Sequence, residues 1–211
     1  MEYVLTTSAL SKKYGKFKAL NDLTMHIPKG AIYGFVGRNG AGKTTLIRLI
    51  CGLQEPTSGG YTIYGIENTN RQISKSRRRM GAVVETPSVY LNMTAEDNLK
   101  QQCLTLGIPT YDFIPEILKL VGLENAGKKR VRNFSLGMKQ RLGIAVALIG
   151  NPDFLVLDEP INGLDPQGII EIRVLILNST VNIKLQRLFQ VIFSTNSRNL
   201  PLITVLLTKD I

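Results

Sequence analysis

The segment from Gly37 to Thr44 has the spacing G-x-x-x-x-G-K-[ST], and it constrains the fold more than any other part of the chain. An apolar run precedes it, and residues 43–51 after it have the apolar spacing of a helix. Glycines let successive backbone N–H groups turn toward an anion, and a helix beginning there adds the positive end of its dipole. A strand, loop and helix in this order predict a nucleotide phosphate site, against the alternative of a chance glycine-rich turn.

Two side chains of this loop carry specific expectations. The amine of Lys43 can reach the β- and γ-phosphates of a nucleotide, and the hydroxyl of Thr44 can ligate Mg²⁺. The residues expected to bind the nucleotide here are Gly37, Arg38, Asn39, Gly40, Ala41, Gly42, Lys43, Thr44 and Thr45.

A second chemical element is an apolar run, residues 154–157, that ends in two acids. Asp158 at the end of a strand suits organisation of Mg²⁺, and Glu159 is placed to act as general base on an attacking water. On its own this pattern also fits two solvated carboxylates; together with the phosphate loop it indicates hydrolysis of a nucleotide.

The order of the remaining patterns predicts an α/β fold, a P-loop NTPase core with an inserted helical subdomain. Strands are predicted at 3–9, 19–27, 31–36, 61–64, 81–84 and 153–157, and helices at 43–51, 94–106, 112–121 and 135–149. The single domain is expected to have an α/β core at 1–85 and 151–177, a helical subdomain at about 86–150, and a divergent tail at 178–211.

Composition narrows the functional classes. With 211 residues, 44% hydrophobic and 20% charged, the chain is expected to fold as one globular domain. No 18-residue apolar run and no leader pattern is found, so a cytoplasmic location is expected. The net charge is +10, but the basic runs at 77–79 and 128–130 have no interleaved aromatics, which favours a solvated or lipid-facing surface over nucleic acid. Cys51 and Cys103 are expected to be reduced, buried thiols.

At residues 134–141, Phe-Ser-Leu-Gly-Met-Lys-Gln-Arg, the chain resembles the Leu-Ser-Gly-Gly-Gln signature of the ATP-binding cassettes of ABC transporters, with three of the five positions altered. The resemblance extends over residues 1 to about 173. It implies that Ser135 and Gly137, at a helix start, bind the γ-phosphate held by a second cassette. Taken alone, Ser135 is an ordinary helix N-cap.

The resemblance assigns three further positions. Tyr14 matches the aromatic residue that stacks on adenine, with a surface tyrosine as the alternative, and residues 162–166 match the loop that crosses to the partner cassette. Glu85 stands where the family has a glutamine that senses Mg²⁺ and the membrane subunit. A carboxylate there can still ligate Mg²⁺ and take part in catalysis. Together with the altered signature, Glu85 resembles the branch that exports bacitracin- and lantibiotic-type peptides.

The resemblance therefore implies an ABC-type ATPase that binds ATP and Mg²⁺. The implied partners are a second cassette, most simply in a homodimer, and integral membrane permease subunits that hold the chain at the cytoplasmic face of the cell membrane. No nucleic-acid partner is expected, because the ABC proteins of ribosomes and DNA carry a second cassette or a long coiled-coil insertion.

Past Arg173 the resemblance stops, and the chain is expected to be truncated or frameshifted there. The family needs a further helix, a buried strand and a switch histidine, but no histidine follows His26. Permitted codons for residues 189–193, read in another frame, spell Ser-Ser-His-Ile, so we hypothesise a frameshift near residues 173–177; a divergent tail is the alternative. Two expectations follow: marginal stability, and the alternative function of a cassette that binds ATP without hydrolysing it.

Overall fold

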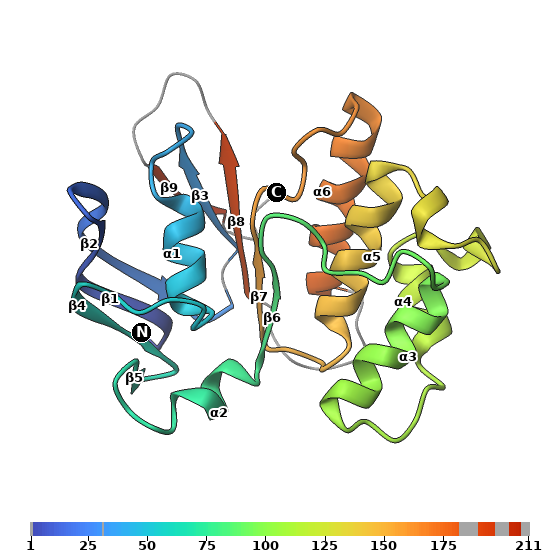
Figure 1. The fold of residues 1–211 in the computed structure, drawn as a ribbon, viewed down its shortest axis with the longest axis horizontal. Helices are drawn as coiled ribbons and strands as arrows, with labels where there is room; N and C mark the ends of the chain where they lie inside the picture. Colours follow the sequence, from blue (N-terminus) through green and yellow to red (C-terminus); the bar gives the residue numbers. More distant parts are fainter. Residues whose placement is uncertain (1, 31, 182–189, 197–202, 208–211) are drawn as a thin grey trace.

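Two β-sheets lie on either side of helix α1 (Lys43–Ile50) in the computed structural model, which describes residues 2–30, 32–181, 190–196 and 203–207 (Figure 1). The smaller sheet is antiparallel with the strand order β2-β1-β4-β5. Its strands are β1 (Tyr3–Tyr14), β2 (Phe17–Pro28), β4 (Ser58–Ile63) and β5 (Ile66–Glu67). The apolar face of α1, with Leu46, Ile47, Leu49 and Ile50 fully buried, fills the space between the sheets.

The larger sheet has the strand order β6-β7-β8-β3-β9. Its strands are β3 (Ile32–Gly37), β6 (Met80–Val83), β7 (Phe154–Leu157), β8 (Gln190–Asn196) and β9 (Ile203–Leu207). Neighbouring strands from β6 to β3 pair in parallel, and β9 pairs antiparallel to β3. Because the carboxyl ends of parallel strands meet at one edge, the loops after β3, β6 and β7 open on the same side of the sheet.

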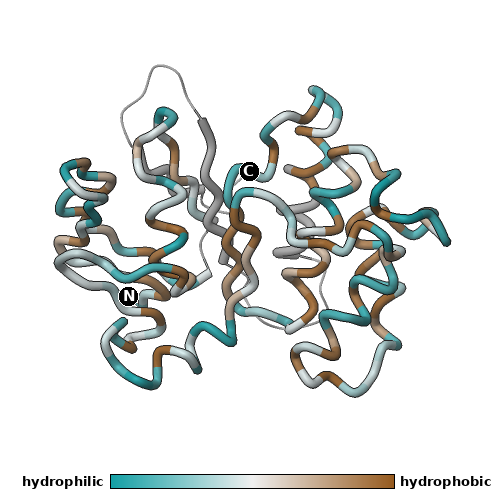
Figure 2. The backbone as a smooth tube through the Cα atoms, in the orientation of Figure 1, coloured by the Kyte–Doolittle hydropathy of each residue, from teal (hydrophilic) through white to brown (hydrophobic). Residues whose placement is uncertain are grey.

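Strand β7 is apolar at every position because both of its faces are covered. Phe154 and Val156 pack with α1, whereas Leu155 and Leu157 pack with the helical layer, and all four are fully buried. Figure 2 shows the paired segments of β6 and β7 as a hydrophobic band at the centre of the molecule. Alternate side chains of a strand point to opposite faces, so a strand between two cores loses the polar half of its pattern.

The helical layer consists of α3 (Ala95–Leu106), α4 (Ile114–Leu120), α5 (Leu136–Leu148) and α6 (Pro166–Val181), with short 3₁₀ turns at Glu124–Ala126 and Val131–Asn133 (Figure 1). Helix α3 begins with a capping box: the hydroxyl of Thr94 accepts from the backbone N–H of Asp97 at 3.1 Å, and the Asp97 carboxylate accepts from the N–H of Thr94 at 3.3 Å.

Across the described ranges, no helix combines the length and the apolar character needed to cross a bilayer.

Helix α5 packs so closely on β6 that one position there admits only glycine. A Cβ atom at Gly81 would lie 2.1 Å from the carbonyl oxygen of Ala147, which belongs to the backbone of α5 and cannot swing aside. The close approach brings the last turn of α5 down onto the sheet near the beginnings of β6 and β7, where Pro152 lies 3.1 Å from the same Cβ position.

The strands and long helices predicted from sequence are confirmed, with β1 and β2 longer than expected. The short helix α2 (Ile73–Arg77) and strand β5 were not predicted. Of the arginines at 77–79, Arg78 and Arg79 are exposed, as expected of a solvated run, whereas Arg77 is partly buried. Arg77 donates to the carbonyl of Ile50 and to the hydroxyl of Tyr61, and Arg79 pairs with Asp153.

The end of the chain also differs from expectation. Helix α6 continues to Val181, past the point where the resemblance was expected to stop, and β8 lies in the centre of the larger sheet. A helix and a strand therefore follow the part of the chain that carries the resemblance. Residues 182–189, part of the segment that the hypothesised frameshift near residues 173–177 would affect, lie outside the described residues.

The two cysteines are free thiols, Cys103 buried and Cys51 partly buried at the end of α1. Burial raises the pKa of the Cys51 thiol to about 12, an effect that the nearby Arg77 opposes. A thiol in this state is inert at neutral pH, in keeping with a structural role.

Replacing Gly81 by alanine is expected to lower the free energy of unfolding by about 1–3 kcal/mol, because the added methyl group meets a rigid carbonyl. The measurement is equilibrium denaturation by urea. Gly150→Ala serves as the control, since its Cβ meets only Leu106 at an ordinary 3.4 Å. Equal stability of the two variants would contradict the packing described for α5 and β6.

Replacing Thr94 by alanine is expected to cost about 1 kcal/mol by removing the helix cap. Hydrogen bonds from Thr94 lower the pKa of Asp97 below its ordinary value of 3.8. The part of this advantage that depends on the ionised Asp97 carboxylate should therefore be present above pH 3.8 and be lost as the pH falls through the lowered pKa. Thr105→Ala on the same helix, where the hydroxyl only donates to the Gln101 carbonyl, should change stability by less than about 0.5 kcal/mol at any of these pH values.

Candidate nucleotide-binding site

The loop between β3 and α1 has the backbone geometry that its glycines predict. Gly40 and Gly42 both adopt left-handed conformations, with φ of 81° and 88°. At Gly42 a side chain is excluded a second time, because a Cβ atom would lie 2.2 Å from the carbonyl oxygen of Ala19. Gly42 is also the N-cap of α1, so the loop delivers the positive end of that helix to its own concave side.

Lys43, the first residue of α1, curls back over this loop. Its side chain is 4% exposed, and its Nζ atom donates to the carbonyls of Gly37 at 2.9 Å and Arg38 at 3.0 Å. The ammonium group therefore lies inside the loop, where phosphate oxygens would approach it. Thr44 and Thr45 are partly buried beside it, whereas Arg38, Asn39 and Gly40 are exposed at the tip.

The acidic pair lies across from Lys43. Asp158 is 1% exposed, and its backbone N–H donates to the carbonyl of Val83 at 2.8 Å, which carries the β6–β7 pairing one residue beyond the strands. Glu159 has a left-handed backbone with φ of 48°. One of its carboxylate oxygens lies 3.8 Å from Lys43 Nζ, and the other accepts from the Asn162 side chain at 3.0 Å. The structure thus brings Lys43 and Glu159 together at one edge of the sheet.

Glu85 takes a different partner. It follows β6, has a left-handed backbone with φ of 60°, and its side chain is 53% exposed. Its carboxylate accepts from the guanidinium of Arg48 on α1 at 2.5 Å. Sequence reasoning missed Arg48, which was the polar position within the apolar pattern of residues 46–50; a charged residue there was the available signal.

Ser135 is the N-cap of α5, and its hydroxyl accepts from the N–H of Met138 at 3.2 Å. The structure therefore confirms the expectation that Ser135 is a helix N-cap. The loop after the acidic pair packs against the same helix start: a Cβ at Gly137 would lie 3.7 Å from Leu164, and one at Gly163 would lie 3.0 Å from Leu136. Asp165 then begins α6 by accepting from the N–H of Gly168.

Tyr14 lies apart from the loop contacts described so far, at the end of β1 beside the turn into β2. Its ring is 42% exposed, its hydroxyl pairs with the Gln54 side chain, and the Lys12 ammonium lies 5.5 Å from the ring centroid.

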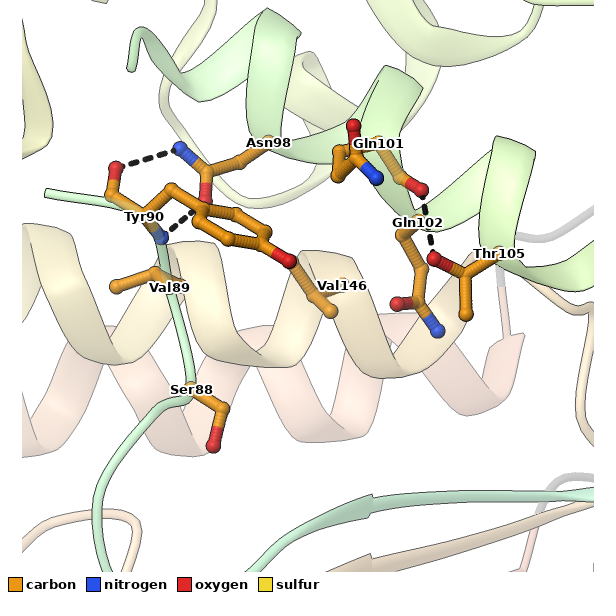
Figure 3. A pocket seen from close by; sticks show the side chains of 8 residues that line it. All are labelled: Ser88, Val89, Tyr90, Asn98, Gln101, Gln102, Thr105 and Val146. Atoms are coloured by element: carbon orange, nitrogen blue, oxygen red, sulfur yellow. Dashed lines mark hydrogen bonds between the residues drawn. The ribbon is translucent and has the colours of Figure 1, made fainter. Parts of the chain in front are cut away.

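A hollow of about 460 Å³ lies beside the segment that follows Glu85 (Figure 3). Ser88, Val89 and Tyr90 form one side, and side chains of α3 and Val146 of α5 form the other. Asn98 fixes the segment to α3, because its side chain accepts from the N–H of Tyr90 at 2.7 Å and donates to the Tyr90 carbonyl at 3.1 Å. Polar groups of Gln102 and Thr105 complete the lining.

Pro87 ties this segment to α5 as well. A Cβ atom at Gly143 of α5 would lie 2.6 Å from the Pro87 ring, so the two approach as closely as glycine allows. The residues between Glu85 and Tyr90 are therefore in contact with both helices that border them.

Comparison with known proteins agrees with this geometry. The sequence profile described as "ABC transporter" matches residues 20–162. The bacitracin transport ATP-binding protein BcrA of Bacillus licheniformis is 50% identical over 176 residues, which are 83% of this chain and 57% of that protein. The lantibiotic transport ATP-binding protein SrtF of Streptococcus pyogenes is 46% identical over 82% of this chain and 73% of its own length.

Among solved structures, cbiO1 of Clostridium perfringens, described as part of the ABC transporter complex cbiONQ, has a TM-score of 0.80. It is 27% identical, and the match covers 93% of this chain and 80% of that one. The chain spans little more than half the length of the bacitracin transport protein. Since the family profile covers more than half of this chain, the chain belongs to the ABC transporter family.

Proposed function

We propose that this chain binds and hydrolyses MgATP as the nucleotide-binding subunit of an ABC transporter that exports a peptide antibiotic or a similar substrate. The observation that carries the proposal is the meeting of Lys43, held inside the phosphate loop, with Glu159 at the end of β7. The substrate class is proposed from the relatives, whose names refer to bacitracin and lantibiotic transport.

The donor set fits ATP with Mg²⁺. Around the loop the candidate metal ligands are oxygens, the Thr44 hydroxyl and the Asp158 carboxylate, with Glu85 as a third. Within the described ranges no three His, Cys, Asp or Glu side chains gather into a metal cage. The hydroxyl and carboxylate oxygens around the loop suit Mg²⁺, because this ion usually binds through one or two carboxylates together with the phosphates of its substrate. Bound there, Mg²⁺ would neutralise charge on the phosphates.

In this proposal the residues divide the work. The backbone of residues 37–45 and the Lys43 ammonium bind and orient the phosphates, Asp158 and Thr44 hold the metal, and Glu159 accepts a proton from the attacking water. Asn162 donates to one oxygen of Glu159 and so fixes the orientation of the carboxylate, whose other oxygen lies 3.8 Å from Lys43 Nζ. Tyr14 would stack on the adenine ring.

A second copy of the chain would complete the site. We propose that Ser135 and Gly137 contact the γ-phosphate bound by the partner cassette, since a capped helix start offers N–H groups and a favourable dipole to an anion. The contacts of Gly163 with Leu136 and of Leu164 with Gly137 would transmit movement of the acidic pair to this surface.

The permease contact is proposed at the hollow bordered by Ser88, Tyr90 and α3. Its wall begins three residues after Glu85, and Pro87 links that wall to α5. Docking there would place the chain on the cytoplasmic face of the membrane, held by its membrane subunits.

One observation supports a second candidate, a cassette that binds ATP without turnover. The only histidine of the chain, His26, lies on β2 with its ring 5.2 Å from that of Tyr3. Strand β2 belongs to the smaller sheet, and the sequence has no second histidine that could act as the switch histidine expected from the resemblance.

Saturating MgATP, at about 100 times its Kd, is expected to raise the free energy of unfolding by about 2.7 kcal/mol and the melting temperature by roughly 5–10 °C. The measurement is thermal unfolding with and without MgATP. Lys43→Met should abolish the shift, because the ammonium inside the loop is lost. An equal shift in that variant would show that the nucleotide binds elsewhere.

Glu159→Gln is expected to lower the ATPase rate by about 10²–10⁴-fold while leaving the MgATP-dependent thermal shift intact, because only the proton acceptor is removed. Release of phosphate from radiolabelled ATP measures the rate. Wild-type protein that shifts with MgATP yet has no turnover would support the second candidate instead.

A further inference from the structure

Two glutamates occupy matched positions at the ATP-binding edge of the larger sheet. The last registered pair of β6 and β7 is Val83 with Leu157, and Glu85 and Glu159 each follow two residues later on adjacent parallel strands. Both have left-handed backbones, with φ of 60° and 48°. Non-glycine residues pay a conformational cost for this geometry, so surrounding contacts must hold each of them in place.

Helix α1 supplies a cation to each glutamate. Lys43 lies 3.8 Å from Glu159, and Arg48 donates to Glu85 at 2.5 Å. The two ion pairs differ in their surroundings. Lys43 is 4% exposed and also bonded to the loop carbonyls, whereas the Arg48 and Glu85 side chains are 35% and 53% exposed. A pair that open to water is weak and readily exchanged.

The ion pair with Arg48 affects how Glu85 could bind a metal ion. In the structure one of its carboxylate oxygens, Oε1, is engaged by the Arg48 guanidinium. If Glu85 ligates Mg²⁺, as proposed above, the carboxylate must be drawn away from a cation on α1 toward a cation at the phosphates. Arg48 and Mg²⁺ then compete for the same group.

We propose that Arg48 is a positioning residue that holds Glu85 away from the metal in the nucleotide-free protein and releases it when MgATP binds. The inference rests on the proposed function of the site. We call the ion pair between Arg48 of α1 and Glu85 the latch. It keeps the segment 85–90, which reaches the hollow of Figure 3, attached to α1 until Mg²⁺ binds the Glu85 carboxylate.

The test is the Mg²⁺ concentration that gives half of the full thermal shift at fixed, saturating ATP, which requires no turnover. Arg48→Met is expected to lower this midpoint by about two- to fivefold, the range for loss of an exposed ion pair. Arg48→Lys should keep a midpoint close to the wild type. Arg79→Met removes another exposed arginine ion pair, with Asp153 at the opposite ends of β6 and β7, and should leave the midpoint unchanged.

A double-mutant cycle separates the latch from the general effect of one positive charge. In a Glu85→Gln background, Arg48→Met should change the midpoint by much less than in the wild type. An unchanged or higher midpoint for Arg48→Met, or the same change in both backgrounds, would overturn the proposal. Absence of any MgATP shift in the wild type would overturn the proposed function itself, and that result is distinct from the other two.

Discussion

The candidate site depends on one constraint, the parallel pairing that places the phosphate loop and the acidic strand at the same edge of a sheet. Strands β3 and β7 are not neighbours; β8 lies between them and pairs with both, from Ile32 opposite Val191 to Leu157 opposite Phe193. The distance between Lys43 and Glu159 is therefore set by the spacing of three strands. Anything that removed β8 would separate the two halves of the site while leaving each half intact.

The same pairing explains which parts of the structure were predictable. Residues 37–45 and 154–159 carry local patterns, because a glycine turn or a doubly buried strand restricts residue type at each position, and the structure has both elements where they were expected. The position of β8 was not predictable, because residues 190–196 have the apolar character of many strands and nothing in them specifies two parallel neighbours. Glu85 was identified, but its partner Arg48 was not, since a single charged residue within a helix usually faces solvent.

Glycine positions link the site to the helical layer. Gly81 lets α5 rest on β6, Gly143 lets α5 meet Pro87, and Gly163 lets the loop after the acidic pair meet the start of α5. At Gly81 and Gly143 the neighbour is a backbone carbonyl or a rigid ring, whereas at Gly163 it is the side chain of Leu136. The contacts at Gly81 and Gly143 transmit displacement with little loss, because no flexible side chain lies between the parts. Helix α5 thus touches both segments that leave the acidic edge of the sheet.

The position of the Lys43 ammonium bears on how a nucleotide would be received. A lysine that reached the loop from solvent would have to shed its water and lose side-chain freedom at the moment of binding. Here that group is already dehydrated and held by the carbonyls of Gly37 and Arg38. Binding would then be a replacement of ligands around a fixed cation, and most of the ordering would have taken place when the chain folded. The affinity of such a loop is set in part by how readily two backbone carbonyls give up their hydrogen bonds, a quantity encoded in the shape of the turn itself.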